Sequence, residues 1–263
     1  LDTLVLEAGE IMVFFTLDIA IAEEEFTSYC RRAVRDGCGL ALSHICVSCS
    51  HTHNSPVVSH GMNHELDPDL EYWEMIAEKM VSSARRALKH LRPARVTLDQ
   101  APVNGFYNNR NRPGEEYNDR CDILTFETPE GLPIVRLLNL ACHPTILGAQ
   151  NVWITADFFG VLRRSMQGIT GIPVMIFNGE AGDVSPRLVK RGVDWNECIR
   201  YGEGIAAQLT ESKHPCRLEV PSISVQSLIL PIDYTPRTNA YLLEKQQELK
   251  EELKTLEPDS NRA

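Results

Sequence analysis

The sequence lacks a hydrophobic run long enough to cross a membrane. Its most apolar window, 11–22, is interrupted by Asp18 and falls well short of the roughly 20 residues that a spanning helix needs. Basic residues are also scarce, because 26 Lys and Arg stand against 36 Asp and Glu and give a net charge of -10. Surfaces that bind nucleic acid or anionic lipid need clustered Lys and Arg. We therefore expect no transmembrane helix, no nucleic-acid partner, and a small or neutral substrate.

A disulfide framework is missing as well. The eight cysteines are scattered, and several lie in apolar, strand-like runs where a free cysteine packs as a small hydrophobe. We interpret them as mostly reduced thiols, which weakly favours a cytoplasmic location and leaves the compartment open. The sequence also begins at Leu1 without a Met, inside an alternating apolar run, so we expect the natural N-terminus to be missing.

Strand-like and helix-like patterns alternate along the chain. β-Branched and aromatic runs bounded by turn residues predict strands at 4–6, 11–15, 45–49, 95–103, 121–127, 134–142 and 173–177. Helical periodicity predicts helices at 23–35, from Asp69 to a stop at Pro93, near 157–168 and near 194–212. This order is typical of an α/β fold in which a mixed β-sheet is flanked by helices.

The segment 237–257 is a further predicted helix with strong helix formers and a narrow leucine stripe at Leu242, Leu249, Leu253 and Leu256. Its many charges are typical of a solvated face. The alternative is a helix that binds a partner or forms a homo-oligomer through the stripe.

Four polar residues follow predicted strands: Asp18, His51, His143 and Ser185. In open α/β sheets, ligands bind beyond the carboxyl ends of the strands. We therefore expect active-site residues at these strand ends, gathered on one edge of the sheet.

The pair His51 and His53 is the sharpest local signal. Alternate residues of an extended segment point to the same side, so His51-Thr52-His53 can turn two imidazoles toward one ion. His143, fixed by Pro144 after an apolar strand, is a third imidazole that can join them. A catalytic zinc ion takes such ligands and keeps a position for water. The alternative is a pair of exposed or hydrogen-bonded loop histidines.

Three nearby residues are weaker ligand candidates. His60 and His64 lie in the loop after the pair, where contact with substrate or solvent is the better interpretation. Cys49 shares a side with His51 if the strand continues, but a buried strand thiol is the better interpretation there.

Two further segments contain candidate functional residues. In 177–187, Gly179 and Gly182 allow the backbone to turn tightly, and Ser185 stands just before a proline as a candidate nucleophile. The alternative is an ordinary turn with a capping serine. In 107–113, Arg110 and Arg112 suit binding of carbonyl or anionic oxygens, although this loop could equally be surface.

Taken together, these segments resemble the ordered motifs of the neutral/alkaline, non-lysosomal ceramidases and their bacterial relatives over roughly 1–230. The motifs are Ser-His-Thr-His at 50–53, Asn-Arg-Asn-Arg at 109–112, Ala-Cys-His-Pro-Thr at 141–145 followed by Ala156-Asp157, and Gly-Asp-Val-Ser-Pro at 182–186. Four motifs in the same order are more specific than any one of them.

The resemblance implies a zinc-dependent amidase domain over 1–232, followed by a charged helix and tail over 233–263. Its zinc ligands would be His51 and His143, and its active-site serine would be Ser185. The remaining implied site residues would hold the substrate, stabilise developing charge or match an acidic position near the site: His53, Arg110, Arg112 and Asp18. The expected substrate is a small-molecule or lipid amide.

The sequence departs from the family's pattern in two places. The family completes its zinc shell with a Glu and a Tyr from a later part of the catalytic domain, so we expect the other ligands beyond the end of this chain. Asn54-Ser55-Pro56 stands where the ceramidases carry Ser-Gly-Pro, which leaves the identity of the amide open.

The mechanistic hypothesis is amide hydrolysis in which a zinc-bound water or Ser185 attacks the carbonyl carbon. An amidohydrolase-type barrel would need more metal histidines, and only His143 and His214 follow His90. A metallo-β-lactamase-like enzyme would need an Asp-His soon after the pair. The rival from another class is a non-catalytic binding module that retains the scaffold.

Overall fold

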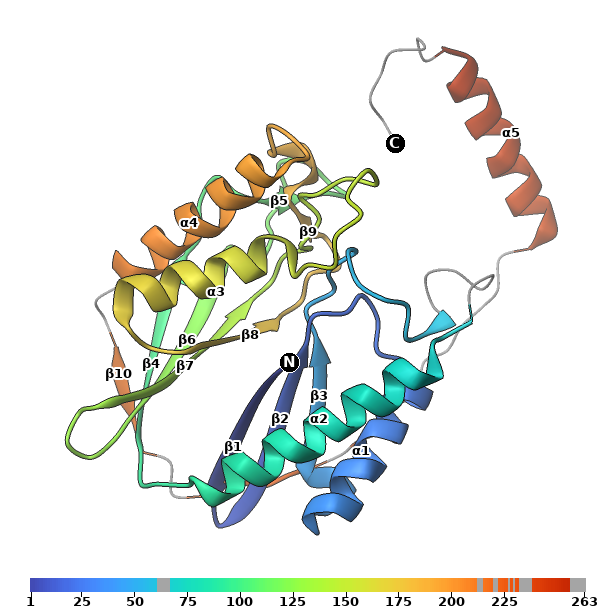
Figure 1. The fold of residues 1–263 in the computed structure, drawn as a ribbon. Coiled ribbons are helices and arrows are strands. Elements are labelled where there is room, and N and C mark those ends of the chain that lie inside the picture. The colour runs from blue at the N-terminus through green and yellow to red at the C-terminus, as the bar shows by residue number, and fades with distance from the viewer. Residues whose placement is uncertain are drawn as a thin grey trace. The chain divides into compact units, whose positions relative to one another are not determined.

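The computed structural model describes residues 1–60, 67–211, 215–219, 222–226, 228, 230–231 and 238–255 (Figure 1). The chain divides into two compact units, Leu1–Val225 and Gln226–Ala263. In the first unit, helices flank mixed sheets, which confirms the predicted α/β class. No helix within the described residues is both long and apolar enough to cross a membrane. All eight cysteines are free thiols, as predicted.

A three-stranded sheet forms the first half of this unit. Its strands are β1 (Asp2–Ala8), β2 (Glu10–Leu17) and β3 (Ile45–Cys49), in that order. Strands β1 and β2 form an antiparallel hairpin whose turn residue, Gly9, has a positive φ of 87°. Strand β3 pairs in parallel with β2, because α1 (Glu24–Cys38) and the short helix η1 (Leu42–His44) carry the chain back between them.

Helix α2 (Leu70–Lys89) packs on α1, and both pack against this sheet (Figure 1). The side chain of Asp69 caps α2 by accepting a hydrogen bond from the Tyr72 N–H at 3.1 Å. Phe26 and Trp73 pack edge to face in the core between these helices and the sheet.

A five-stranded sheet forms the second half, in the order β10-β4-β6-β7-β8. Its strands are β4 (Arg95–Pro102), β6 (Arg120–Glu127), β7 (Pro133–Leu140), β8 (Val174–Asn178) and β10 (Cys216–Leu218). All neighbours are antiparallel except β7 and β8, which are parallel because α3 (Asp157–Thr170) lies between them in the chain. The sheet is therefore mixed, as predicted.

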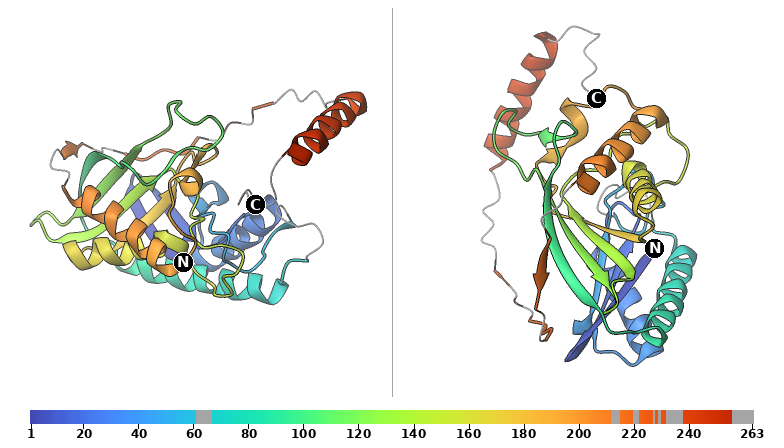
Figure 2. Two further views of the ribbon diagram at one scale, coloured as in Figure 1. Left: turned by 90° about the horizontal axis from the view of Figure 1, so that it is seen from above. Right: turned by 90° about the vertical axis from the view of Figure 1, so that its left-hand side faces the viewer.

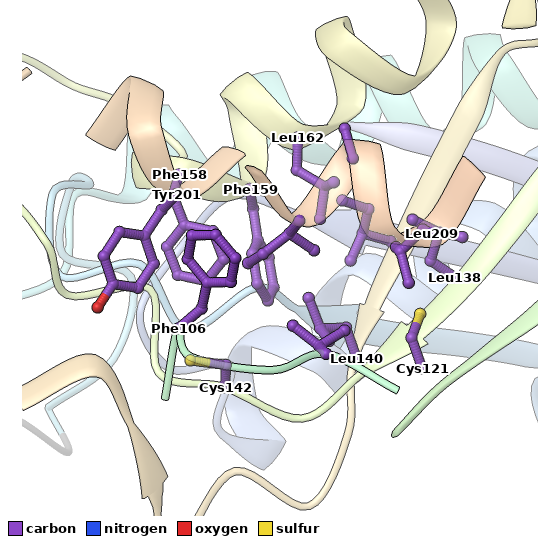
Figure 3. Packing of buried hydrophobic residues seen from close by; sticks show 14 of the residues in the cluster. Phe106, Cys121, Leu138, Leu140, Cys142, Phe158, Phe159, Leu162, Tyr201 and Leu209 are labelled. Carbon is purple, nitrogen blue, oxygen red and sulfur yellow. The ribbon is translucent and has the colours of Figure 1, made fainter. Parts of the chain in front are cut away.

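Helices α3 and α4 (Trp195–Glu211) lie together over one face of the five-stranded sheet (Figure 2). The core between them is rich in aromatic side chains (Figure 3). Tyr201 packs against Phe106 and Phe158, with ring centroids 5.2 and 5.7 Å away. This core fixes the start of α3, which lies beside the candidate site.

The two sheets meet where β2 and β3 approach β8. Phe14 and Phe177 pack edge to face across this junction, with ring centroids 6.1 Å apart. At the carboxyl ends of β3 and β8, the Asn178 side-chain amide donates to the Ser50 carbonyl at 2.8 Å. The junction brings the carboxyl ends of strands from both sheets to one edge.

A two-stranded ladder completes the first unit at this edge. Strand β5 (Asn108–Asn109) pairs antiparallel with β9 (Val184–Ser185), and the short helix η3 (Pro186–Leu188) follows β9. The ladder joins the two loops that were predicted separately as candidate functional segments.

The second unit contains helix α5 (Asn239–Thr255). Leu242, Leu249 and Leu253 are exposed on it. Leu256 lies outside the described residues, and so does the predicted domain boundary after 232. Association through this helix therefore stays a prediction.

The close contact between α3 and α4 depends on a residue without a side chain. A Cβ on Gly202 would lie 2.4 Å from the Val161 Cβ and 2.7 Å from the Leu162 nitrogen. Because backbone cannot move aside cheaply, we expect Gly202→Ala to lower the free energy of unfolding by about 1–3 kcal/mol. Urea denaturation checks this value.

Gly168→Ala in α3 is the matched control, since nothing lies within 4 Å of a Cβ built there. This change should raise stability by about 0.5–1 kcal/mol, because alanine is the better helix former. Equal effects of the two substitutions would contradict the packing argument.

Candidate functional site

Three histidine rings converge at the edge where the two sheets meet. The ring centroids of His51 and His143 lie 4.8 Å apart, those of His51 and His53 lie 5.0 Å apart, and those of His53 and His143 lie 6.4 Å apart. His51 and His53 follow β3 of the first sheet, and His143 follows β7 of the second. The two histidine segments, 90 residues apart in the chain, therefore form one cluster.

His51 is held in a strained but well-anchored conformation. Its φ is +66°, a left-handed value that costs a non-glycine residue of the order of 1–3 kcal/mol. Its N–H donates to the Ile19 carbonyl at 3.0 Å, and its Nδ1 lies 2.6 Å from the Ala20 carbonyl. Because a carbonyl only accepts, the ring proton sits on Nδ1 and the Nε2 lone pair is left available.

His143 is anchored in the same way from the other sheet. Its backbone N–H and its Nδ1 both donate to the Val184 carbonyl at 3.0 Å. The side chain is buried, and this burial lowers its pKa. A neutral ring with its proton on Nδ1 again leaves Nε2 as a free lone pair.

His53 is the most exposed of the three rings. Partial burial lowers its pKa first, and the nearby His51, His143 and Arg110 lower it further. His53 is therefore neutral at pH 7 and can accept a proton.

The guanidinium of Arg110 lies close enough to this cluster for its positive charge to lower the pKa of both His53 and His143. Its Nε and Nη2 donate to the Gly182 carbonyl at 3.1 and 2.9 Å, and its backbone N–H donates to the Asp183 carbonyl. These bonds fix the charge on the ladder between β5 and β9. Three guanidinium N–H groups remain for other acceptors.

The arrangement fits two ligands of a metal ion. Imidazoles that bind zinc commonly donate their second N–H to a carbonyl or carboxylate, which fixes the tautomer and the ring. His51 and His143 both meet this requirement. No group of three or more His, Cys, Asp or Glu side chains that could hold one ion exists within the described residues. The described residues thus offer His51 and His143 as candidate ligands and no group of three.

The segment that leads into α3 joins the two histidine loops. Thr52 donates its hydroxyl to the Thr155 carbonyl at 2.8 Å, and the Thr155 N–H donates to the Asn54 carbonyl at 2.9 Å. Asn54 also donates its side-chain amide to Asp157 at 3.5 Å. Residues 52–54 are therefore held directly by 155–157.

Asp157 also holds the loop after His143. Its carboxylate accepts from the N–H groups of Ile146, Leu147 and Phe158 at 3.2, 2.9 and 2.7 Å. The residue is buried and has a positive φ of 53°. Burial raises the pKa of Asp157, while the three N–H donors act against that rise.

Lys190 supports the same loop from outside. Its ammonium donates to the carbonyls of Thr145 and Ile146 at 2.9 and 3.3 Å. Burial lowers the pKa of Lys190, and the charge of Asp157 opposes this shift. The loop after His143 is therefore fixed at both its N–H and its carbonyl groups.

Ser185 lies next to Val184, the residue that anchors His143. It is buried, and its Oγ accepts from the Arg187 N–H at 3.2 Å, so it caps η3. Its backbone pairs with Asn108 in the ladder. The capping role that the sequence left open is present, and a catalytic role stays a prediction.

Asp18 and Arg112 make contacts of a different kind. Arg163 of α3 bridges the carboxylates of Asp18 and Asp2, at 2.5 and 2.6 Å, so Asp18 takes part in a structural ion cluster. Arg112 pairs with Glu115 at 3.3 Å on the surface. These described contacts do not bring either residue to the histidine cluster, and their catalytic roles stay predictions.

The weaker ligand candidates either have structural hydrogen-bond partners or lie outside the described residues. The thiol of Cys49 donates to the Ala20 carbonyl at 3.7 Å, and burial raises its pKa. The His60 backbone N–H donates to the Glu23 carboxylate. His64 and His214 lie outside the described residues.

Two solved ceramidase structures have folds similar to that of this chain. One is described as a ceramidase complexed with C2, and the other as the neutral ceramidase from Pseudomonas aeruginosa. Both superpose with a TM-score of 0.69 at 18% sequence identity and cover 79% of this chain.

The chain has a ceramidase-like fold. It spans only 37% and 38% of the two solved chains. No family model and no curated protein matches the sequence. The resemblance of the motifs and the likeness of the folds are thus two separate observations that agree.

Most of the residues that hold the two histidine loops cannot be recognised from the sequence. The sequence indicates Asp157 only as part of a motif. It gives no sign that the histidine loops are held by Asn54, Thr155 and Lys190. The signal for Asp157 was its place at the start of an apolar helix, where an acidic side chain meets free N–H groups. The other three contacts join distant segments and leave no local pattern.

We expect Asp157→Ala to loosen both histidine loops. The change leaves the buried N–H groups of Ile146 and Leu147 without an acceptor and places alanine at a positive φ. Each lost partner costs about 1–3 kcal/mol, so the free energy of unfolding should fall by at least about 2 kcal/mol. Amide hydrogen exchange at Ile146 and Leu147 should become faster.

Asp157→Asn is the matched control. Asparagine tolerates the left-handed backbone and keeps one acceptor oxygen, so its loss of stability should be smaller than that of Asp157→Ala. Unchanged exchange at both amides in the alanine variant would show that Asp157 does not hold the loop.

Proposed function

We propose that the protein is a zinc-dependent hydrolase that cleaves an amide (N-acyl) bond. The observation that carries this proposal is the pair His51 and His143, whose Nδ1 atoms are fixed on backbone carbonyls and whose rings lie 4.8 Å apart. The ceramidase-like fold supports the same reaction class. The proposed substrate is a small-molecule or lipid amide.

His51 and His143 would hold the zinc ion through Nε2, as two of its ligands. When bound, zinc polarises a carbonyl group and lowers the pKa of a bound water to about 7. Imidazoles bind metal only in the neutral form, and the lowered pKa of His143 keeps its ring neutral at pH 7.

His53 and Arg110 would act on the substrate. The neutral His53 can take a proton from the nucleophile and return it to the leaving amine. The guanidinium of Arg110, fixed on the Gly182 carbonyl, supplies positive charge where an oxyanion develops. The nucleophile is either water or Ser185. Asp18 and Arg112, held in ion pairs, are assigned no step.

Loss of one anchored imidazole should abolish metal binding. We expect His51→Ala to reduce the zinc content of the purified protein to a small fraction of the wild-type value, since the remaining ligand set would be too weak. Elemental analysis after dialysis measures this content.

His90→Ala is the matched control, because His90 is exposed at the end of α2 and hydrogen-bonds the Arg86 carbonyl. It should leave the zinc content unchanged. Stoichiometric zinc in His51→Ala would overturn the assignment of that ligand.

Hydrolysis should depend on the metal. In a panel of N-acyl amides, we expect product formation that a chelator abolishes and added Zn²⁺ restores, because the proposed chemistry needs the ion. Mass spectrometry of the released acid and amine measures it. Amide binding without turnover in zinc-loaded protein would instead favour the non-catalytic binding module.

A further inference from the structure

A small cavity of about 170 Å³ is lined in part by His53. Its walls come from the turn after β2 and from the loop that follows the histidine pair. The apolar residues of the lining are Ala20, Ile21, Pro56, Val57 and Val58. Apart from His53, none of the residues that line the cavity is charged or titratable.

The two serines in the lining do not make the cavity polar. The Ser55 hydroxyl accepts from the Ala20 N–H at 3.1 Å and donates to the Pro56 carbonyl at 3.3 Å. The Ser59 hydroxyl accepts from the Glu23 N–H at 3.1 Å and donates to the Ile21 carbonyl at 3.2 Å. Both hydroxyls are thus used by the backbone, and the interior presents mainly carbon atoms to a ligand.

The walls are tied to the rest of the structure. The same serine bonds join the two loops, and Trp73 of α2 donates its indole N–H to the Val58 carbonyl at 3.0 Å. Val58 is buried in the core with Trp73. Because these bonds already hold both loops, a ligand would not need to order them, and the cavity is preformed.

The cavity also adjoins the proposed reaction centre. His53 and Ala20 are among its lining residues, and the carbonyl of Ala20 is the group that anchors the Nδ1 of His51. When a substituent of the substrate occupies the cavity, the amide group attached to it would therefore lie beside the histidine cluster.

The volume limits what can enter. An apolar cavity of about 150 Å³ holds one benzene molecule, whereas pockets for drug-sized ligands measure about 300–1,000 Å³. The present cavity, at about 170 Å³, has room for roughly six carbon atoms by this comparison. The further carbon atoms of a long acyl chain would lie outside it and gain no burial there.

We infer that this cavity binds a compact apolar substituent of the amide, with about six carbons or fewer, and selects short-chain substrates. The substituent is either the acyl chain or the alkyl group on the nitrogen. The role of the cavity in a reaction rests on the proposed hydrolase function, but its ability to bind such a group does not.

The test is a titration of the full chain with two homologous series. Linear primary amides from acetamide to dodecanamide probe the acyl side, and N-alkylacetamides of the same lengths probe the nitrogen side. NMR shifts of the Val57 and Val58 methyl groups report binding at the cavity. In one series, affinity should rise roughly fourfold for each added methylene and then level off near six carbons.

We call the chain length at which affinity levels off the break. The series that shows it identifies the side of the amide that enters the cavity. Affinity that keeps rising to twelve carbons in both series, or shifts that leave both valines unaffected, would overturn the inference. Binding with the break but without hydrolysis in zinc-loaded protein would retain the cavity and remove the proposed function.

Val57→Trp should fill the cavity. We expect it to weaken binding of the six-carbon amide at least tenfold and binding of acetamide much less. Ile169→Trp is the matched control, because Ile169 is exposed near the opposite end of α3 from Asp157. It should change neither affinity.

Val57→Ala covers the case in which the tryptophan variant does not fold. The enlarged cavity should move the break to a longer chain, and a break that stays in place would contradict the inference. Circular dichroism melting curves establish that each variant is folded.

Discussion

The buried carboxylate of Asp157 is the constraint on which the candidate site depends. It accepts N–H groups from the loop after His143 and from the start of its own helix, and it receives the side-chain amide of Asn54 from the loop of the histidine pair. One short acceptor thus joins the loop of Asn54 to two segments far along the chain. Its left-handed backbone persists because these bonds and the aromatic core under α3 hold it in place.

Much of this architecture could be predicted from sequence because it rests on local patterns. Alternating apolar residues in β1 and β2 and the periodic apolar face of α2 specify elements near their observed bounds, and polar residues after strands indicate the edge where His51 and His143 meet. The convergence of strand ends follows from the fold class alone.

The rest depends on long-range contacts that no local pattern encodes. Asp18 follows a predicted strand, and no local pattern indicates that Arg163, from a helix far along the chain, engages it in an ion cluster with Asp2. Ser185 stands just before a proline as a candidate nucleophile, and its buried hydroxyl also caps η3. The two sheets also meet through contacts such as that of Phe14 with Phe177, which periodicity cannot specify.

The two anchored imidazoles follow strands that contribute to different hydrophobic cores. His51 follows a strand of the core built around Phe26 and Trp73, and His143 follows a strand of the core around Phe158 and Tyr201. An ion shared by both rings would be bound only when both cores are folded, so its binding free energy would add to the cooperativity between them. Metal loading would then make the two halves unfold in a single transition at a higher temperature.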